Sequence, residues 1–262
     1  MRAKQSQTFQ IDSSMLQYAI IPWDSEYLHN TTVEIENFSV KSFTALKKII
    51  AQFQHALHLI KGDLMFSKIP LEDYPRIQML DQAGFYYIEQ SITLDVDLSV
   101  WKPNEFIFQR SGTYQLIPAS LQDKQSIRQI AQSTFTADRF HLDPNIAKAK
   151  ADYRFEMWIE NSFHSSDTIY KFVDKENTII GFFIVHERPE YAEFRLAGLD
   201  PQYVGRGLGK MLYHHMYRLL KEKKYKTIKS VISLNNIQVL NVYMYLTHAK
   251  FNNPLIVLHK VL

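Results

Sequence analysis

The chain has 262 residues, of which 46% are hydrophobic and 22% are charged. This length is enough for one large domain or two small ones, and the composition excludes a largely disordered chain. No apolar segment approaches the roughly 20 residues that a membrane-spanning helix needs. The first residues contain no apolar stretch, so no signal peptide is expected. Because cysteine is absent, disulfides and thiolate catalysis are excluded, and a cytoplasmic protein is expected.

The charge of the chain is nearly balanced, because 30 basic residues and 27 acidic residues give a net charge of +3. A nucleic-acid binder usually carries a basic stripe, so nucleic acid is not an expected partner. Residues 221–226 form one basic cluster, but they end a predicted helix, where cations interact with the negative end of the helix dipole. The slight positive charge is compatible with an anionic small molecule.

The first third of the chain predicts a small α/β domain. Apolar residues recur with helical spacing after Ser42, and a later segment alternates apolar and polar residues as a half-buried strand does. Polar sequence with proline and glycine near residue 110 indicates a boundary, so the predicted domains are residues 1–110 and 111–262. The expected elements are a helix at 43–57, a short helix between Pro75 and Gly84, and a strand at 92–98.

The rest of the chain mixes strands and helices, which predicts an α/β fold around a mixed sheet. The order of helix, breaker, aromatic residue and strand after residue 80 recurs after residue 246, which raises the idea of a degenerate duplication. The expected strands are 114–117, 169–173, 179–185, 194–199, 227–234 and 254–262. The expected helices are 120–135, 151–163, one after a glycine cluster and one after the strand at 227–234.

Three glycines at alternate positions, Gly205, Gly207 and Gly209, connect a predicted strand to a helix. Glycine lets backbone N–H groups approach a ligand closely, and the first amides of a helix have no partner within it. An anion at this place gains about 0.3–1 kcal/mol from the helix dipole, besides its hydrogen bonds. The segment therefore predicts a phosphate-binding loop. Glycines that only turn the chain are the alternative, although a simple turn does not need three.

The glycine spacing does not fit two other phosphate-binding motifs. A dinucleotide fingerprint needs Gly-x-Gly-x-x-Gly, and here the third glycine comes one residue early. A P-loop needs Gly-x-x-x-x-Gly-Lys followed by Ser or Thr. Val204 replaces its first glycine and Met211 replaces its hydroxyl residue, so this motif is excluded as well.

Residues 199–209 read Leu-x-Pro-x-x-Val-Gly-Arg-Gly-Leu-Gly and resemble the acetyl-coenzyme A signature of the GNAT N-acetyltransferases. That signature is written Arg/Gln-x-x-Gly-x-Gly/Ala, and Val204 stands where Arg or Gln is usual. The resemblance implies the GNAT fold, with acetyl-CoA as cosubstrate. It also implies that the loop binds the coenzyme A pyrophosphate and that the end of the strand binds pantetheine and the acetyl carbonyl. The implied cofactor-binding residues are Gly198, Leu199, Val204, Gly205, Arg206, Gly207, Leu208 and Gly209.

A second segment with the same resemblance begins at Asn236. The family's pattern of Asn, six residues and Tyr occurs here at Asn236 and Tyr243. The resemblance implies that Asn236 contacts the cofactor arm and that Tyr243 lies beside the thioester sulfur, where it protonates the leaving thiolate. A phenol of pKa about 10 and a thiol of pKa about 8.5 make that transfer uphill by roughly 2 kcal/mol. A tyrosine that only packs in the core is the alternative.

Glu193 lies six residues before Leu199, a spacing that resembles that of the glutamate base in histone-type members of the family. An ion pair with Arg195 is the alternative, and a water chain could remove the amine proton instead. Because cysteine is absent and no Ser–His–Asp order is discernible, direct attack in a ternary complex is expected. The ten histidines include no His-Glu-x-x-His and no evident third ligand, so no metal is expected.

Residues 135–163 are similar to the bacterial TDP-fucosamine acetyltransferase family, whose members also carry a small N-terminal α/β domain. This likeness implies that Arg139 and Trp158 bind the substrate, and that the acceptor is the amino group of a nucleotide-linked aminodeoxy sugar. A surface cation and a packing aromatic are the alternatives for these two residues. An enzyme for an amino acid, peptide or other small amine, and a non-catalytic sensor of coenzyme A, remain open. The expected partners are acetyl-CoA and a small-molecule amine, without nucleic acid or membrane, and a homodimer remains open.

Overall fold

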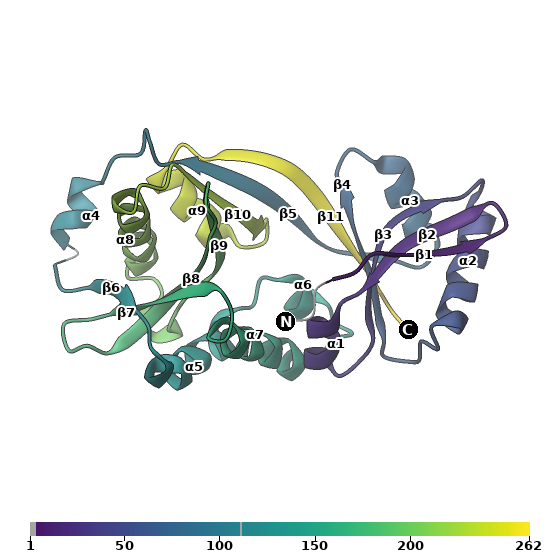
Figure 1. The fold of residues 1–262 in the computed structure, drawn as a ribbon, viewed down its shortest axis with the longest axis horizontal. Coiled ribbons are helices and arrows are strands. Elements are labelled where there is room, and N and C mark those ends of the chain that lie inside the picture. The colour runs from purple at the N-terminus through teal and green to yellow at the C-terminus, as the bar shows by residue number, and fades with distance from the viewer. Residues whose placement is uncertain (1–3, 111) are drawn as a thin grey trace. The chain divides into compact units, whose positions relative to one another are not determined.

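The computed structural model describes residues 4–110 and 112–262, whose helices and strands are drawn in Figure 1. The chain forms two compact units. Unit 1 consists of the residues through Ser91, Arg139–Arg154 and Pro254–Leu262, and unit 2 consists of Ile92–Asp138 and Phe155–Asn253. This division differs from a single boundary near residue 110, because a middle segment and the last strand return to unit 1. The assignment of residues 1–110 and 111–262 to separate functional domains stays a prediction.

Unit 1 contains a sheet in the order β1-β2-β3-β4-β11. Strand β3 pairs with β4 in parallel, and the other neighbours pair antiparallel. Its strands are β1 (Gln7–Ile11), β2 (Ser14–Ile20), β3 (Thr32–Ser39), β4 (Leu64–Pro70) and β11 (Lys250–Val261), which begins in unit 2. Its helices are α1 (Pro22–Leu28), α2 (Phe43–Ala56), α3 (Tyr74–Gln82) and α6 (Arg139–Leu142). The sequence predicted α2, α3 and β11, but not α1 or strands β1 to β4.

Helix α2 follows the predicted pattern. The Ser42 hydroxyl accepts a hydrogen bond from the amide of Ala45 at 3.2 Å and so caps the helix. Its buried side chain Phe53 packs edge to face on Tyr18 of β2, with ring centroids 4.7 Å apart. The other buried residues of the helix are Leu46, Ile49 and Ile50, all of them predicted.

Unit 2 contains a sheet in the order β5-β10-β9-β8-β7-β6. Strands β6 to β9 pair antiparallel, and β10 pairs with β9 in parallel. Its strands are β5 (Tyr86–Asp97), β6 (Gln115–Pro118), β7 (Asp167–Val173), β8 (Ile179–Glu187), β9 (Ala192–Leu199) and β10 (Thr227–Ser233). Its helices are α4 (Glu105–Arg110), α5 (Lys124–Thr134), α7 (Lys148–Ser162), α8 (Leu208–Glu222) and α9 (Ile237–Leu246), with 3-10 turns at Leu121–Asp123 and Pro201–Tyr203. Strand β5 and helix α7 begin in unit 1.

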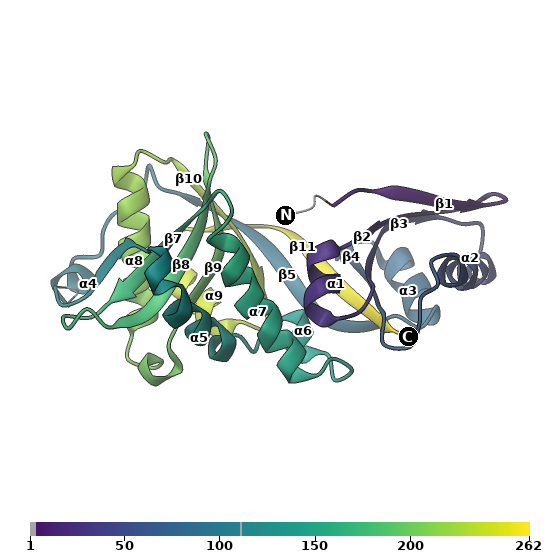
Figure 2. The same cartoon turned by 60° about the horizontal axis from the view of Figure 1, so that its bottom comes forward.

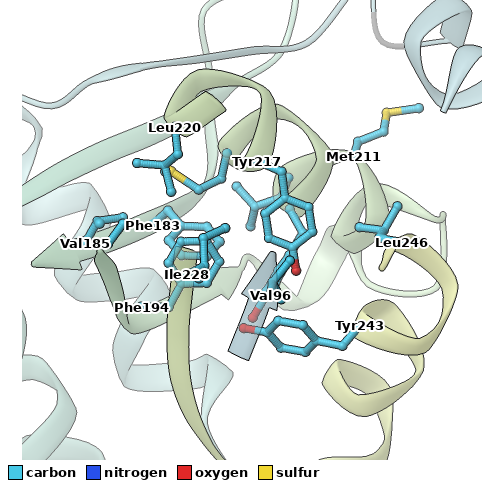
Figure 3. Close-up of a cluster of buried hydrophobic side chains, with 14 of the residues drawn as sticks. Val96, Phe183, Val185, Phe194, Met211, Tyr217, Leu220, Ile228, Tyr243 and Leu246 are labelled. Carbon is cyan, nitrogen blue, oxygen red and sulfur yellow. The ribbon is translucent and has the colours of Figure 1, made fainter. Parts of the chain in front are cut away.

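Two helix layers cover the unit 2 sheet, with α8 on one face and α5 on the other (Figures 1 and 2). Phe183 and Val185 of β8 belong to the buried cluster of α8, which Figure 3 shows. Their neighbours Phe182 and Ile184 pack instead with α5 and α7. Because both faces of β8 are buried, its sequence is a continuous apolar run without alternation. The mixed α/β fold expected from the sequence is confirmed.

The order of elements repeats along the chain. Apart from α1, which lies between β2 and β3, the order β1-β2-β3-α2-β4-α3-β5 corresponds to β7-β8-β9-α8-β10-α9-β11. In both halves a parallel pair is only three residues long, from Thr32↔Leu64 to Glu34↔Phe66 in unit 1 and from Ala192↔Ile228 to Phe194↔Ser230 in unit 2. The shared topology supports the duplication that the sequence raised. The halves differ before the first of their helices, because a serine caps α2 where glycines precede α8.

Among residues 4–110 and 112–262, no helix combines the length and the apolar character that crossing a membrane would require.

We expect acid to destabilise the fold between pH 6.5 and 4, because His214 and His259 are buried. Burial lowers the pKa of each imidazole to about 4. The unfolded state binds these protons first, so the stability is complete above pH 6.5 and falls as the pH drops toward 4. Each histidine accounts for a loss on the order of 3 kcal/mol over that range.

Urea denaturation at pH 7 and pH 4 measures this loss. The variant His214→Gln keeps an acceptor for the Asn104 amide, which lies 3.0 Å from the imidazole, and should lose less stability on acidification than the wild type. His164 is a matched control, because its side chain is 61% exposed, and His164→Gln should behave as the wild type. A wild-type pH dependence in His214→Gln would contradict the prediction.

Candidate functional site

Strands β9 and β10 part inside the unit 2 sheet. They pair only from Ala192↔Ile228 to Phe194↔Ser230 in the described part of the chain, although β9 continues to Leu199. On its other side, β9 stays paired with β8 as far as Leu199. The backbone groups of β9 beyond Phe194 that face β10 therefore lack a strand partner. Such an open edge can bind an extended ligand that carries amide groups. We call the place where the strands part the fork.

A bulge lies where the fork begins. Phe194 faces Val185 and Leu196 faces Ile184, so Arg195 is the extra residue on β9. A bulge bends its strand and increases the local twist, which carries β9 away from β10. Beyond it, the Thr134 hydroxyl of α5 lies 3.0 Å from the Leu199 carbonyl and donates a hydrogen bond to it. The end of β9 is thereby held by α5 and β8.

The loop between β9 and α8 depends on glycine. Gly205 and Gly207 have φ angles of +85° and +80°, in the left-handed region that favours glycine. A Cβ atom at either residue would meet no atom within 4 Å, so the loop is open on that side. Gly207 is the N-cap of α8 and provides no side-chain hydrogen bond to the first turn. The first amides of α8 are therefore available to an anion.

Of the other two predicted glycines, only Gly198 is required by close packing. A Cβ atom at Gly198 would lie 2.8 Å from the ring of Phe182, so glycine lets β9 lie against that ring. A Cβ atom at Gly209 would lie 3.8 Å from Val242 of α9 and 3.9 Å from Leu199. The start of α8, the end of β9 and helix α9 therefore meet, which brings together the two segments of the predicted cofactor site.

The side chains of the loop have different surroundings. Leu208 is buried in the α8 cluster, whereas Val204 is 45% exposed. The guanidinium of Arg206 lies 5.2 Å from the ring centroid of Tyr203, and the Lys210 ammonium lies 3.8 Å from that of Tyr245. Val204 thus offers no charge where the family usually has one, and Arg206 and Lys210 supply positive charge nearby.

Asn236 is the N-cap of α9. Its side-chain oxygen accepts a hydrogen bond from the Val239 amide at 3.2 Å and caps the helix. The cap fixes the start of the helix that carries Tyr243. The side-chain amide remains a potential donor, so a contact with the cofactor arm stays a prediction.

Tyr243 is 1% exposed and lies in the buried cluster on the α8 face, where Figure 3 shows it near Tyr217. Its ring is perpendicular to that of Tyr213 on α8, with centroids 5.3 Å apart. Burial and the nearby Tyr213 hydroxyl raise the pKa of Tyr243 well above 10, while a hydrogen bond from Ser230 opposes that rise. Ser230 is the residue at which β10 leaves β9. Tyr243 is therefore a core residue whose hydroxyl borders the fork.

Glu193 lies at the fork on the other face of the sheet. Successive side chains of a strand point to opposite faces, and the next residue, Phe194, packs on the α8 face. The Glu193 carboxylate lies 3.2 Å from the guanidinium of Arg195, so the ion pair weighed as an alternative is present. Both side chains are about one-third exposed, at 28% and 35%. Catalysis by Glu193 stays a prediction.

Arg139 is buried in unit 1. Its guanidinium lies 3.1 Å from the Asp24 carboxylate, which also binds Arg154 at 2.7 Å. It also covers the ring of Phe66, 3.8 Å from the centroid, and that of Phe140, at 4.3 Å. These contacts are structural, and they differ from the surface cation that was the alternative interpretation. The roles of Asp24 and Arg154 in this ion cluster could not be predicted from the sequence, because ion pairs between distant segments leave no local pattern.

Trp158 belongs to an aromatic stack in unit 2. Its ring is stacked on Phe155, with centroids 6.0 Å apart, and Phe155 is stacked on Phe135 at 4.3 Å. The packing interpretation of Trp158 therefore describes the contacts found. Substrate binding by Arg139 and Trp158 stays a prediction.

Within residues 4–110 and 112–262, no group of three His, Asp or Glu side chains is arranged to hold a metal ion.

The forked strands, the glycine loop and the helix that follows form the kind of site expected of the GNAT fold. Residues 125–246 match the acetyltransferase (GNAT) family. This part of the chain is accordingly a GNAT acetyltransferase domain, as the loop sequence predicted.

Known proteins are similar to this chain over most of its length. The spore coat polysaccharide biosynthesis protein SpsD of Bacillus subtilis (strain 168) is 20% identical over 221 residues, which are 84% of this chain and 75% of that protein. A GCN5-related N-acetyltransferase from Sphaerobacter thermophilus has a TM-score of 0.65 at 11% identity, over 95% of this chain and 82% of that chain. A tandem GNAT protein from the clavulanic acid biosynthesis pathway has a TM-score of 0.55 at 12% identity, over 95% and 78%.

The structural role of Arg139 predicts strong energetic coupling with Asp24. Breaking a buried ion pair by removing one partner costs about 3–5 kcal/mol, because the other charge stays buried. We expect Arg139→Met and Asp24→Asn each to lower the free energy of unfolding, and the double variant to lose less than the sum by about 0.5–3 kcal/mol. Denaturant unfolding of the four proteins measures this coupling.

The exposed pair of Arg218 and Glu222 is the control, and its coupling should be only about 0.3–0.5 kcal/mol. Additive losses for Arg139 and Asp24 would contradict the structural role of Arg139.

Proposed function

We propose that the chain transfers an acetyl group from acetyl-CoA to the amino group of a nucleotide-linked aminodeoxy sugar. The main observation in favour of acetyl-CoA as the cosubstrate is the fork, where β9 leaves β10 after Phe194 and ends in an open glycine loop. Membership of the GNAT family supports the same reaction type. Other small amines remain the second acceptor class, and a coenzyme A sensor is the non-catalytic alternative.

The residues of the fork fit acetyl-CoA. The amides of the loop and of the first turn of α8 would hold the diphosphate, with Arg206 and Lys210 adding positive charge. The open edge of β9, from Arg195 to Leu199, would bind the amides of pantetheine as a neighbouring strand would. Acetyl-CoA supplies an acetyl group activated as a thioester.

The chain's own groups lie on two faces of the sheet at the fork. Glu193, or water beside it, is placed to take a proton from the acceptor amine on one face. The Tyr243 hydroxyl would give a proton to the departing sulfur from the other face, and it interacts with Ser230 and Tyr213. Because burial raises the pKa of Tyr243, it remains a neutral proton donor at all physiological pH values.

Two observations support a sugar as the acceptor. The relative SpsD is named for spore coat polysaccharide biosynthesis, and its similarity extends over 84% of this chain. Residues 135–163 also resemble the TDP-fucosamine acetyltransferase family, which favours a nucleotide-linked aminodeoxy sugar over a free one. Turnover of acetyl-CoA with a panel of nucleotide-linked amino sugars, glucosamine and amino acids distinguishes the acceptor classes. Binding without turnover would support the sensor instead.

Substitution of Gly207 tests the cofactor loop. Alanine disfavours the left-handed conformation by roughly 1–2 kcal/mol, so Gly207→Ala should weaken coenzyme A binding about tenfold. Gly62 is a matched control in unit 1, because its φ is +95° and a Cβ atom there meets no atom within 4 Å. Gly62→Ala should bind coenzyme A as the wild type does in calorimetry. A wild-type protein that binds no coenzyme A would refute the proposed function.

Replacement of Tyr243 tests its role as the acid. Tyr243→Phe should lower kcat by about 10²-fold or more with little change in KM for acetyl-CoA, because the hydroxyl acts only on the leaving group. Tyr217 is the matched control, because its hydroxyl is buried beside Tyr243 without a hydrogen-bond partner among the described residues. Tyr217→Phe should keep kcat. Equal rates in Tyr243→Phe and the wild type would exclude the role.

A further inference from the structure

A row of polar residues crosses four strands of unit 2 on the face opposite α8. Asp167 of β7 lies opposite His186 of β8, His186 lies opposite Glu193 of β9, and Glu193 lies beside Lys229 of β10. Residues that face each other on neighbouring strands point to the same side of the sheet. Ile184, two residues before His186, packs on the α5 side, which fixes the side to which this polar row points.

His186 is held by Asp167 within the polar row. Its Nδ1 atom lies 2.7 Å from the Asp167 carboxylate, and the two side chains are 14% and 13% exposed. An ionised carboxylate only accepts hydrogen bonds, so the neutral imidazole carries its proton on Nδ1. The Nε2 atom then has a free lone pair and can accept a proton.

The charges that face His186 come from each neighbouring element. Asp167 faces it from β7, with the Ser162 hydroxyl of α7 at 3.5 Å from that carboxylate. Glu193 faces it from β9, paired with Arg195. Across Glu193, the Lys229 ammonium lies over the ring of Tyr191, 4.7 Å from the centroid. His186 therefore lies between a carboxylate of β7 and a carboxylate of β9.

Glu193 alone is a weak proton acceptor. The ordinary pKa of a glutamate side chain, near 4.3, is far below that of an ammonium group. Imidazole has an ordinary pKa near 6.5 and accepts a proton more readily at neutral pH. A proton that leaves an amine at the fork is therefore accepted more readily by an imidazole on the neighbouring strand than by a carboxylate.

We propose that His186, oriented by Asp167, receives at Nε2 the proton that the acceptor ammonium loses through Glu193 or water. This inference rests on the proposed function. One N–H bond of the ammonium breaks and an Nε2–H bond forms. The freed amine then forms the N–C bond, and as the C–S bond breaks the same nitrogen loses a second proton to water and becomes the amide nitrogen. Tyr243 supplies the proton for the sulfur and regains one from solvent, and the imidazolium returns its proton to solvent. His186 and Asp167 act through Glu193 and are positioning residues.

NMR of protein labelled with ¹⁵N-histidine tests the orientation of His186 without any substrate. We expect the proton on Nδ1 and a bare Nε2 at pH 8. Asp167→Ala should let the proton move to Nε2. A proton on Nε2 in the wild type would overturn the proposal.

The pH dependence of kcat/KM tests the relay itself, with the amine that the wild type acetylates. We expect kcat/KM of the wild type to fall on the acidic side, and His186→Gln to remove this acidic limb while lowering kcat/KM at least tenfold. Imidazole in solution should restore part of the rate of His186→Ala. The exposed His164, 3.4 Å from Glu160, is the control, and His164→Gln should keep the wild-type profile.

The outcomes separate the two proposals. Turnover with an unchanged acidic limb in His186→Gln would overturn the relay and leave the acetyltransferase function intact. A wild type that binds coenzyme A but acetylates none of the amines would overturn the proposed reaction and the relay together.

Discussion

Strand β9 keeps its hydrogen bonds to β8 along its length and loses those to β10 after three residues. Everything at the site depends on this unequal pairing. The bulge at Arg195 turns the strand, and Thr134 and β8 hold its end, so the free edge stays open without help from a ligand. The loop that follows can then use its amides for an anion, since Gly207 caps α8 without a side chain that would occupy them. A continuous parallel pair would satisfy the same backbone groups and leave no place for a second amide-bearing chain.

The two faces of the unit 2 sheet offer different environments for proton transfer. On the α8 face, Tyr243 is enclosed by aromatic rings, and burial keeps its phenol neutral. On the other face, the polar row of Asp167, His186, Glu193 and Lys229 is partly open to water and mixes both charges. The proposed proton donor therefore lies in a dry environment and the proposed proton acceptor in a wetter one. Such a difference in environment allows groups on either side of one fork to take opposite roles at the same pH.

The first half of the chain shares most of its order of elements with the second half, but its chemistry differs. Its short parallel pair ends at Glu34↔Phe66, and the Ser67 hydroxyl donates a hydrogen bond to the Ile35 carbonyl at 2.7 Å just beyond, where the corresponding edge in unit 2 is open. Ser42 caps the helix that corresponds to α8. The segment 139–154 adds a buried ion cluster around Asp24 to this unit. In the sequence, Arg139 stands in an aromatic segment and so resembles a cation that binds a ligand. Its ion-pair partner Asp24 lies 115 residues away, so the sequence around Arg139 gives no sign of the pair.

The sequence by itself determined the elements whose patterns are local. The amphipathic helix after Ser42, the apolar strand at 179–185 and the glycine loop before α8 follow from spacing, capping and the left-handed conformations that glycine permits. Strands β1 to β4 were missed because their burial comes from partners elsewhere in the chain. Only the tertiary structure decided that β9 and β10 part at Ser230, that Tyr243 is buried there, and that His186 lies between two carboxylates. These facts depend on the register of strands that are distant in the sequence, and a shift of one residue would turn each side chain to the opposite face.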